Sequence, residues 1–498
     1  MKVKRLHLQN YGRFEDLKID FAPTSEKVGN VTVIVGNNGA GKSQVLQALA
    51  TNLSWFVAKL ASDEDGFNID KTYINNGKNE VKASIRVDFN ENNPMPYGLE
   101  EDADWSITSV KDGRLKSSSN YMKLLSKTVR SFRSNLTKED KYSLPLITFY
   151  SVNRTISVEI QKDIFSYQYD QLDAYKNCLN SNSIVFSNFL DWFRNSEDIE
   201  NERKVSTESI LEGLNSENEK VLNEVKKILS QLKSSKEDKV NIGLEMLEES
   251  KYKIEKEIHE VQKLQKHSED ISRDLPLFFV KSALKYFTGF TDFYIRRKGT
   301  ATMIVEKDGE KLDVNQLSQG EKSLLALVGD IARRLAILNP SLANPLEGEG
   351  VVMIDEVDLH LHPKWQHDLI DKLVATFPNV QFILTTHSPH VISDRNDLLL
   401  YSLDDGELTE MPNVYGEDAN TVLTKIFDVD IRDSKVEEQF NVIRRAISKH
   451  DYVTADTRIT ELAKKLPSDH LELLKCRLLL AQAKLAKSNK DESNHAKD

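Results

Sequence analysis

The stretch Gly36 to Ser43, GNNGAGKS, follows the apolar run VTVIV at Val31 to Val35 and leads directly into SQVLQALATNL. This is the pattern G-x-x-x-x-G-K-S/T in the context that gives it meaning, a buried strand, a glycine loop and a helix. Glycine permits backbone angles that turn successive N–H groups toward phosphate oxygens, and the N-terminus of the helix adds its positive end. The prediction is a phosphate cradle in which Lys42 reaches the β- and γ-phosphates and Ser43 ligates Mg²⁺. Its members are Gly36, Asn37, Asn38, Gly39, Ala40, Gly41, Lys42, Ser43 and Gln44.

The composition narrows the class of protein. Of the 498 residues, 39% are hydrophobic and 29% are charged, and the formal net charge is -11. This net negative charge argues against a protein that coats nucleic acid without sequence preference, but it does not exclude a local basic groove. No run approaches the roughly 18 apolar residues of a membrane span, and the N-terminus has no apolar signal region, so we expect a cytoplasmic protein without a membrane contact. Two cysteines, Cys178 and Cys476, are too few for a disulfide framework or a cysteine metal cluster.

Strand patterns surround the loop. Residues 2 to 21 alternate apolar and polar side chains and predict two strands joined at Asn10 to Arg13. The segment LPLITFYSVNR, Leu144 to Arg154, is interpreted as a central strand that ends near the nucleotide. Two later apolar runs, GVVMI at Gly350 to Ile354 and VQFILTT at Val380 to Thr386, predict further buried strands.

The stretch 155–285 has the character of a helical insertion. Heptad-like spacing predicts two seams separated by the polar break KSSKED, so the simplest geometry is an antiparallel hairpin about 30 Å long at 1.5 Å per residue. Two interpretations stay open, a solvated helical pair with an ordinary packed face and a projecting arm that contacts DNA or a partner. The first seam comprises Leu214, Val221, Val225, Ile228 and Leu232. The second comprises Val240, Leu244, Leu247, Ile254, Ile258 and Val261, with Lys251 in one seam position.

A short basic cluster, Arg296 to Lys298, follows the insertion within a renewed strand pattern. KDGE in that pattern predicts a hairpin turn. Three charges are common on a solvated strand edge, and a DNA contact is the alternative interpretation.

Carboxylates and a histidine follow the two later strands. Asp355 and Glu356 come directly after GVVMI, where we expect Asp355 to hold Mg²⁺ and Glu356 to act as general base on the attacking water. His387 comes directly after VQFILTT. A lone histidine is usually structural, but this position favours a contact with the γ-phosphate.

A second anion-binding surface is predicted at Leu317 to Ser323, LSQGEKS, which precedes the helical pattern LLALVGDIARRLAILNP. Ser318, the backbone of Gly320 and the N-terminus of the following helix would form it. The motif lies too far along the chain to be another cradle for the same face of the same nucleotide.

These motifs resemble a known family. LSxGE before a helix is the signature of ABC-type ATPases. With the phosphate loop, DEVDLHLHP at Asp355 to Pro363 and THSPH at Thr386 to His390, it resembles the nucleotide-binding domain shared by Rad50, SMC, RecF and overcoming-lysogenisation-defect proteins. FSNFLDWFRNSEDIEN in the insertion and VYGEDANTVL after the last strand resemble PtuA, the ATPase subunit of Septu anti-phage systems, including its retron-associated relatives.

The resemblance implies roles for residues at matching positions. Lys42, Glu356 and His387 would be catalytic, with His387 as the γ-phosphate sensor. Ser318 and Gly320 would act on the nucleotide of a second protomer, and Glu321 would be a further cofactor-binding residue. Arg13 matches an arginine near the nucleotide, and Asp358 matches the loop that lines the dimer seam. A glutamine expected before the insertion is missing, since that position offers Asn153 and Arg154, with Gln161 later, which puts rapid hydrolysis in doubt.

The fold class predicted is α/β, an ABC-type ATPase head with a mixed sheet and a phosphate-loop core, interrupted by a helical or short coiled-coil insertion and followed by a C-terminal helical segment. The expected parts are an N-terminal lobe at 1–154, the insertion at 155–285 and a C-terminal lobe at 286–410. The last part, 411–498, would serve oligomerisation or partner binding.

The function implied by the resemblance is an ATP- and Mg²⁺-dependent ATPase that scaffolds and regulates a separate HNH nuclease of the PtuB type. It would work as a homo-oligomer of at least two copies. A retron reverse transcriptase and its msDNA are further partners in the retron context. A Rad50- or RecF-like DNA-binding ATPase in repair is the alternative. A third hypothesis, that the chain is itself a nuclease, is disfavoured because about a hundred mostly helical residues stand where a Toprim domain would follow.

Overall fold

In the computed structural model the chain forms two compact units, Met1–Gly416 and Glu417–Asp498. None of the described helices is long and apolar enough to cross a membrane. The structure describes residues 1–89, 102–111, 122–138, 142–152, 170–180, 186–233, 241–266, 273–298, 301–427, 434–467 and 470–495.

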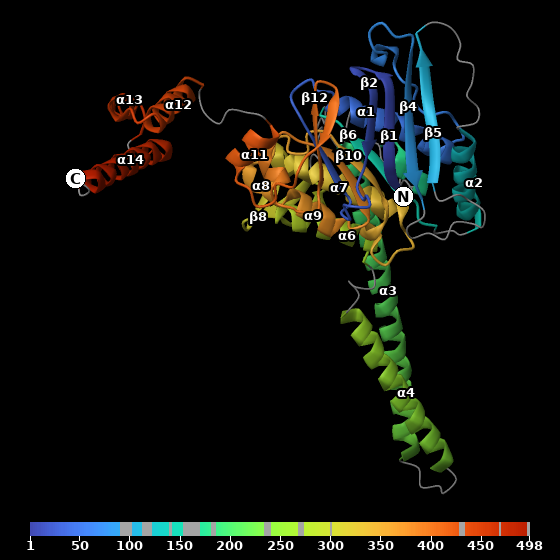
Figure 1. Cartoon of the computed structure of the whole chain (residues 1–498). Helices are drawn as coiled ribbons and strands as arrows, with labels where there is room; N and C mark the ends of the chain where they lie inside the picture. Colours follow the sequence, from blue (N-terminus) through green and yellow to red (C-terminus); the bar gives the residue numbers. More distant parts are fainter. Residues whose placement is uncertain are drawn as a thin grey trace. The chain divides into compact units, whose positions relative to one another are not determined.

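A six-stranded mixed sheet lies in the first unit (Figure 1). In spatial order its strands are β13 (Glu407–Glu410), β12 (Leu399–Asp404), β3 (Val31–Val35), β11 (Val380–Thr385), β10 (Gly350–Ile354) and β6 (Leu146–Tyr150). Neighbours pair in parallel except β13, which is antiparallel to β12. Every residue of β3, β10 and β11 is buried, as expected for parallel strands covered on both faces. The three buried strands predicted from the apolar runs are therefore confirmed.

The position of β6 corrects one expectation. It was predicted as a central strand, but it is at the edge of the sheet beside β10. Its residues are buried because another segment covers this edge. The Phe149 N–H donates to the Cys178 carbonyl at 2.7 Å, and the Thr148 hydroxyl donates to the same oxygen at 3.1 Å. A covered edge strand carries the same apolar signature as a central one, so sequence could not separate the two.

A second, antiparallel sheet confirms the strands predicted before the loop, and the amide of Gln381 joins it to the first sheet. This amide donates to the carbonyls of Val3 and Ala22 and accepts from the Val3 N–H.

In a third sheet the predicted KDGE turn is confirmed, with Asp308 and Gly309 at φ 52° and 82°. The second sheet has the order β2 (Phe14–Asp20), β1 (Lys2–Tyr11), β4 (Glu80–Asp88) and β5 (Asp102–Val110). The third contains β7 (Thr291–Arg296), β8 (Thr302–Lys307) and β9 (Glu310–Asp313).

Helices pack around the sheets, and α7 is buried along most of its length. Its Asp330 receives bonds from Arg333 and Arg334 and from the Tyr150 hydroxyl of β6 at 3.0 Å. Burial alone would raise the pKa of Asp330, but the two guanidinium groups outweigh it and hold the pKa well below its usual range. The helices of this part are α1 (Lys42–Ala61), α2 (Met122–Lys138), α6 (Leu275–Thr288), α7 (Gln319–Leu338), α8 (Pro363–His367), α9 (Leu369–Thr376) and α10 (Pro389–Ile392). Short 3-10 turns are η1 (Lys71–Tyr73), η2 (Gln171–Tyr175), η3 (Val314–Gln316) and η4 (Pro345–Glu347).

The insertion contains a helical hairpin. α3 (Phe186–Lys233) is one continuous helix of 48 residues and runs beside α4 (Asn241–Lys266) (Figure 1). The predicted α4 seam is half-buried at Leu247, Ile254, Ile258 and Val261, with Lys251 half-buried among them. Leu232, Val240 and Leu244 are outside the residues whose side chains the structure describes.

The seam on α3 differs from the prediction. Leu214, Val221 and Ile228 are 46%, 44% and 44% exposed, so their assignment to the seam was wrong. Apolar side chains on α3 cover a stripe that is wider than the face one partner helix can bury. The spacing of these side chains therefore does not decide which of two neighbouring sets of residues contacts α4. The leucines buried in their place, each less than a tenth exposed, are Leu211, Leu222 and Leu229.

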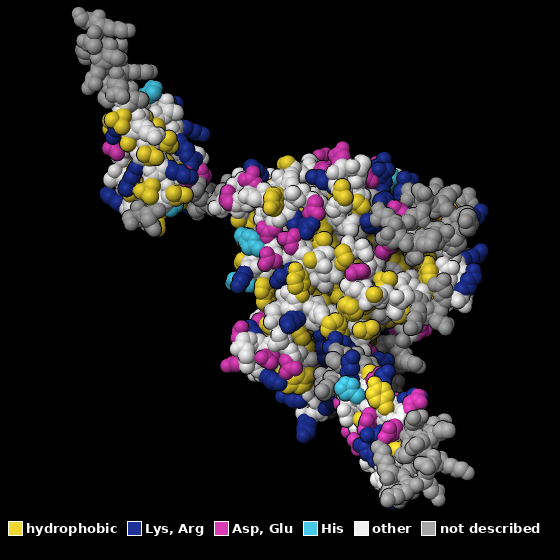
Figure 2. Space-filling model, turned by 90° about the horizontal axis from the view of Figure 1, so that it is seen from below, with side chains coloured by type: hydrophobic (Ala, Val, Ile, Leu, Met, Phe, Trp, Pro, Cys, Tyr) yellow, Lys and Arg dark blue, Asp and Glu magenta, His cyan; other side chains and the backbone are white. Residues whose placement is uncertain are grey.

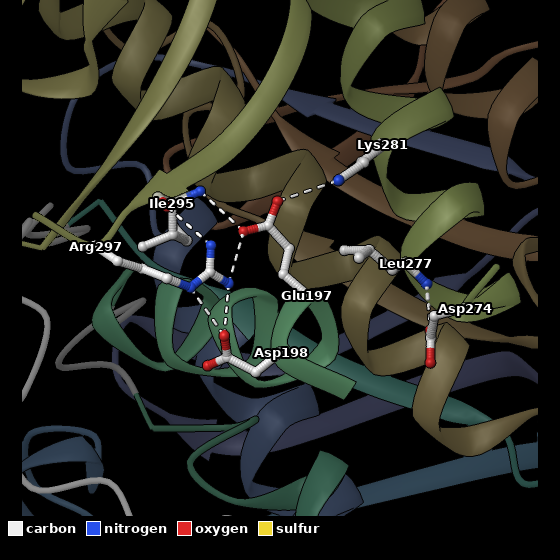
Figure 3. Close-up of polar contacts among 7 residues, drawn as sticks. All are labelled: Glu197, Asp198, Asp274, Leu277, Lys281, Ile295 and Arg297. Atoms are coloured by element: carbon white, nitrogen blue, oxygen red, sulfur yellow. Dashed lines mark hydrogen bonds and ion pairs between the residues drawn. The ribbon is translucent and has the colours of Figure 1, made fainter. Parts of the chain in front are cut away.

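The N-terminal part of α3, here called its root (residues 186–198), is held by charged contacts to other elements of the first unit, here called the head (Figure 3). The Glu197 carboxylate accepts from Lys281 of α6 at 3.2 Å and from the backbone N–H of Ile295 at 2.9 Å. Arg297 forms ion pairs with Glu197 at 3.4 Å and with Asp198 at 2.7 Å. On the neighbouring face of the root, a Cβ at Gly329 of α7 would lie 2.9 Å from the Phe189 ring. These contacts join α3 to α6, β7 and α7.

The C-terminal unit contains α11 (Ala419–Ile426), α12 (Ser434–Ser448), α13 (Tyr452–Ala463) and α14 (Leu471–His495). Its core includes Phe440, Ile443, Leu473, Cys476 and Leu480. A second face of α14 is exposed, with Leu471, Leu474, Leu478 and Leu485 at 65%, 44%, 59% and 63%. Figure 2 shows apolar side chains interleaved with Lys and Arg on this unit.

The corrected register of the hairpin makes a testable prediction. Leu222→Ala should reduce the free energy of local opening of the hairpin by about 2 kcal/mol, because it removes a buried seam contact. Val221→Ala, one position away, should stay within about 0.5 kcal/mol of the wild type. Amide hydrogen exchange of α3 and α4 measures both, and a larger effect at Val221 would contradict the register.

Candidate functional site

The geometry of the sheet gathers the predicted residues. β3, β11 and β10 are parallel neighbours, so their carboxyl ends meet at one edge. The phosphate loop follows β3, Asp355 and Glu356 follow β10, and His387 lies two residues after the end of β11. Segments more than 300 residues apart in sequence, such as Lys42 and Asp355, therefore share one site.

The phosphate loop depends on glycine at two close approaches. Gly36 has φ 148°, and a Cβ there would lie 2.0 Å from the Leu403 carbonyl oxygen. Gly41, at φ 107°, would place a Cβ 2.5 Å from the Phe14 ring. Any side chain at either position would collide, so the backbone path of the loop requires glycine.

Lys42 begins α1 and lies inside the loop. Its ammonium group donates to the carbonyls of Gly36 at 2.7 Å and Asn37 at 3.1 Å, and the side chain is 6% exposed. Burial lowers the pKa of Lys42, and the carboxylates of Asp355, Glu356 and Asp358 partly oppose that effect.

The other predicted cradle residues lie around this lysine. Asn37, Asn38, Gly39 and Ser43 are exposed, whereas Gly36 and Ala40 are buried. Gln44 points its Oε1 at Gly12, where a Cβ would lie 2.3 Å away. Arg13 donates to the Gly39 carbonyl and lies 3.8 Å from Asp405 of the β12–β13 turn. Arg13 is thus placed against the loop.

The acid pair is held by the end of β11. Asp355 is 2% exposed, and its Oδ1 accepts a bond from the Thr385 hydroxyl at 2.6 Å. The same hydroxyl accepts from the Glu356 N–H at 2.8 Å. The next residue, Thr386, also binds an aspartate, because its hydroxyl donates to Asp358 at 2.5 Å. The sequence-based predictions single out neither threonine, and the available signal is two adjacent hydroxyls at the carboxyl end of a mostly apolar run.

His387 lies in the field of the same charges. Burial lowers its pKa, the nearby Lys42 lowers it further, and Glu356, Asp358 and Asp355 act in the opposite direction. The net shift is downward, so the imidazole is neutral at neutral pH and can donate or accept a single hydrogen bond.

The signature segment is held by contacts of its own. Ser318 caps α7 through a reciprocal pair with Glu321: the Ser318 hydroxyl accepts from the Glu321 N–H at 3.3 Å, and Glu321 Oε2 accepts from the Ser318 N–H at 2.8 Å. The Ser318 hydroxyl also donates to Glu321 Oε2 at 2.7 Å. Lys307 donates to the other oxygen of Glu321 at 2.7 Å. Burial would raise the pKa of Glu321, but the bonds from Lys307 and Ser318 outweigh it and lower the pKa. A Cβ at Gly320 would lie 2.4 Å from the His360 carbonyl oxygen. Among the described residues, no hydrogen bond or ion pair joins Ser318, Gly320 or Glu321 to the phosphate loop.

Fold and site together define an ATPase of the ABC type, in which a glycine loop, an acid pair and a histidine share one edge of a parallel sheet core. The chain belongs to the AAA ATPase domain family, whose model matches residues 1–392.

Relatives agree with this assignment. The chain is 32% identical to the retron Ec83 probable ATPase of Escherichia coli over 92% of its own length and 82% of that protein. It is 31% identical to the retron Vc95 probable ATPase of Vibrio cholerae over 79% of its length and 71% of that protein. A shorter match of 31% identity joins 27% of the chain to 36% of the Septu protein PtuA of Bacillus thuringiensis.

The lowered pKa of His387 predicts a pH dependence of stability. The unfolded chain binds a proton near the ordinary histidine pKa of 6.5, whereas the folded chain does so only at lower pH. Below about pH 6.5 the unfolded state therefore gains protons first, and the folded state loses stability as the pH falls. When the pH is lowered from about 7.5 to 5.5, the melting temperature should fall less for His387→Gln than for the wild type. An equal fall in melting temperature for the two proteins would contradict a lowered pKa of His387.

Proposed function

We propose that two copies of this chain close on ATP and that the resulting assembly controls a separate nuclease of the HNH type in anti-phage defence. The observation that carries the proposal is the division of the site. Lys42, Asp355 and His387 lie at one edge of the sheet, where the charge of Asp355 acts on the pKa values of the other two, whereas no described hydrogen bond or ion pair joins Ser318 or Gly320 to them. A second copy would supply Ser318 and Gly320 to the nucleotide.

The described side chains suit ATP with a divalent cation. Ser43 is exposed at the first turn of α1, and Asp355 Oδ1 is bonded to Thr385, while no bond of its Oδ2 is found among the described residues. Hydroxyl and carboxylate oxygens are the ligands that Mg²⁺ prefers. Bound Mg²⁺ would neutralise charge developing on the phosphates. Lys42 would bind the β- and γ-phosphates, Glu356 would take a proton from the attacking water, and neutral His387 would contact the γ-phosphate.

The defence context is supported by the relatives. Two of them are named as retron ATPases, and a third is the Septu protein PtuA. In this proposal a PtuB-like nuclease, and in a retron the reverse transcriptase with its msDNA, would be the partners.

The exposed leucine face of α14 supports a larger assembly. Leu471, Leu474, Leu478 and Leu485 follow one another at spacings of three, four and seven, which is the repeat of a coiled-coil seam. A second copy would present the same apolar seam, so we propose that α14 joins copies through this face.

A DNA contact through the basic cluster is less well supported. Arg296 is paired with Asp313 at 3.2 Å, and Arg297 with Glu197 and Asp198. Figure 2 shows Lys and Arg mixed with Asp and Glu on the face of the head and arm that it presents. Charges already paired within the fold offer little to phosphates.

The divided site makes a complementation prediction. Lys42→Ala and Ser318→Arg should each abolish ATP hydrolysis, the first by removing the phosphate ligand and the second by blocking the second surface. Mixed dimers of the two variants contain one intact composite site, so mixing should partly restore hydrolysis. A site built within one copy would show no recovery on mixing, which would refute the sandwich.

Control of the nuclease is tested in cells. Glu356→Gln should slow hydrolysis by about 10²- to 10⁴-fold while ATP binding persists. Co-expressed with a PtuB-like nuclease, Lys42→Ala and Glu356→Gln should both lose protection against phage. Full protection by both variants would overturn the proposed regulation but leave the ATPase assignment intact.

The leucine face predicts a change in mass. The double variant Leu474→Asp, Leu478→Asp should lower the solution mass of the oligomer measured by light scattering, because charge on a packed seam is costly. Val453→Asp is the matched control, since Val453 is 79% exposed in the same unit but belongs to α13. An unchanged mass in the double variant would contradict this contact.

A further inference from the structure

The last residue of β11 makes more polar contacts than its place in a buried strand requires. Thr385 is 0% exposed and follows the apolar residues Ile383 and Leu384. Its hydroxyl donates to Asp355 Oδ1 at 2.6 Å and accepts from the Glu356 N–H at 2.8 Å. A hydroxyl has one hydrogen to donate, so this one is committed to the Asp355 carboxylate.

The backbone of Thr385 adds a third contact. Its carbonyl accepts from the Val357 N–H at 2.9 Å, so three successive residues after β10 are tied to one threonine. Glu356 among them has φ 48°, in the left-handed region that residues with side chains seldom adopt. The bond from its N–H to the Thr385 hydroxyl helps to hold the peptide in that conformation, from which the Glu356 side chain departs.

We propose that Thr385 is a positioning residue for ATP hydrolysis, which orients Asp355 toward the cation and Glu356 toward the attacking water. This inference rests on the roles proposed for those two acids. The hydroxyl fixes the rotation of the Asp355 carboxylate and leaves Oδ2 free of protein partners among the described residues. Bonds of this kind, from a neighbour to a metal-binding carboxylate, orient the ligand and tune the metal.

The connection extends to the histidine. Thr385 is two residues before His387 on the same segment, and Thr386 between them binds Asp358. A displacement of the end of β11 would therefore move the histidine and the acid pair together. The hydroxyl thus binds both acids directly, and its position in the chain links them to the segment that carries the histidine.

The test removes the hydroxyl without changing the shape of the side chain. Thr385→Val should lower the hydrolysis rate at saturating ATP by about 10- to 100-fold and raise the Mg²⁺ concentration needed for half-maximal rate. Binding of a fluorescent ATP analogue in EDTA should be unchanged, because Lys42 and the loop are untouched. Thr385→Ser, which keeps the hydroxyl, should restore most of the rate.

Thr148→Val is the matched control. Thr148 is also a buried strand threonine whose hydroxyl donates to a carbonyl, that of Cys178 at 3.1 Å. It should lower the melting temperature much as Thr385→Val does but leave the rate and the Mg²⁺ dependence unchanged. If Thr385→Val hydrolyses ATP like Thr148→Val, or if Thr385→Ser is as slow as Thr385→Val, the positioning role is refuted.

Glu356→Gln measured beside these variants separates the role of Glu356 from that of Thr385. An active Glu356→Gln would refute the proposed role of Glu356 and with it the basis of this inference. An inactive Glu356→Gln together with a fully active Thr385→Val would refute the positioning role alone.

Discussion

Three parallel strands that end together are the constraint on which the site depends. β10, β11 and β3 are paired residue by residue, so the loop after one, the acids after the next and the histidine after the third cannot drift apart. The hydrogen bonds of Thr385 and Thr386 complete this arrangement at the end of β11. The chemistry of the site is thus a property of the sheet edge more than of any single loop.

Much of this edge was readable from sequence because each motif carries its own structural context. An apolar run before GNNGAGKS or before Asp355 predicts a buried strand, and the strand predicts where the polar residue after it must lie. The Thr385 bonds were not readable, because a threonine that closes a strand looks the same whether its hydroxyl meets a catalytic acid or a neighbouring carbonyl. Thr148, bonded to the Cys178 carbonyl, is the second case.

The two corrected expectations share one physical cause. β6 and the α3 seam were both inferred from apolar spacing, which reports that a side chain is suited to burial but not what covers it. At β6 the cover is the segment around Cys178 instead of a second strand. On α3 the stripe offers two adjacent registers, and α4 covers the one that contains Leu222. Which element covers an apolar face depends on the tertiary structure, and the local spacing of apolar residues does not determine it.

The unbroken length of α3 has a mechanical consequence. The helix has 48 residues, about 70 Å at 1.5 Å per residue, and its root is fixed by Glu197 and Phe189. A stiff rod clamped at one end amplifies motion, so a tilt of a few degrees at the root displaces the tip by several ångströms. A spectroscopic label near Lys233 would therefore report movements at the clamp that are too small to detect there directly.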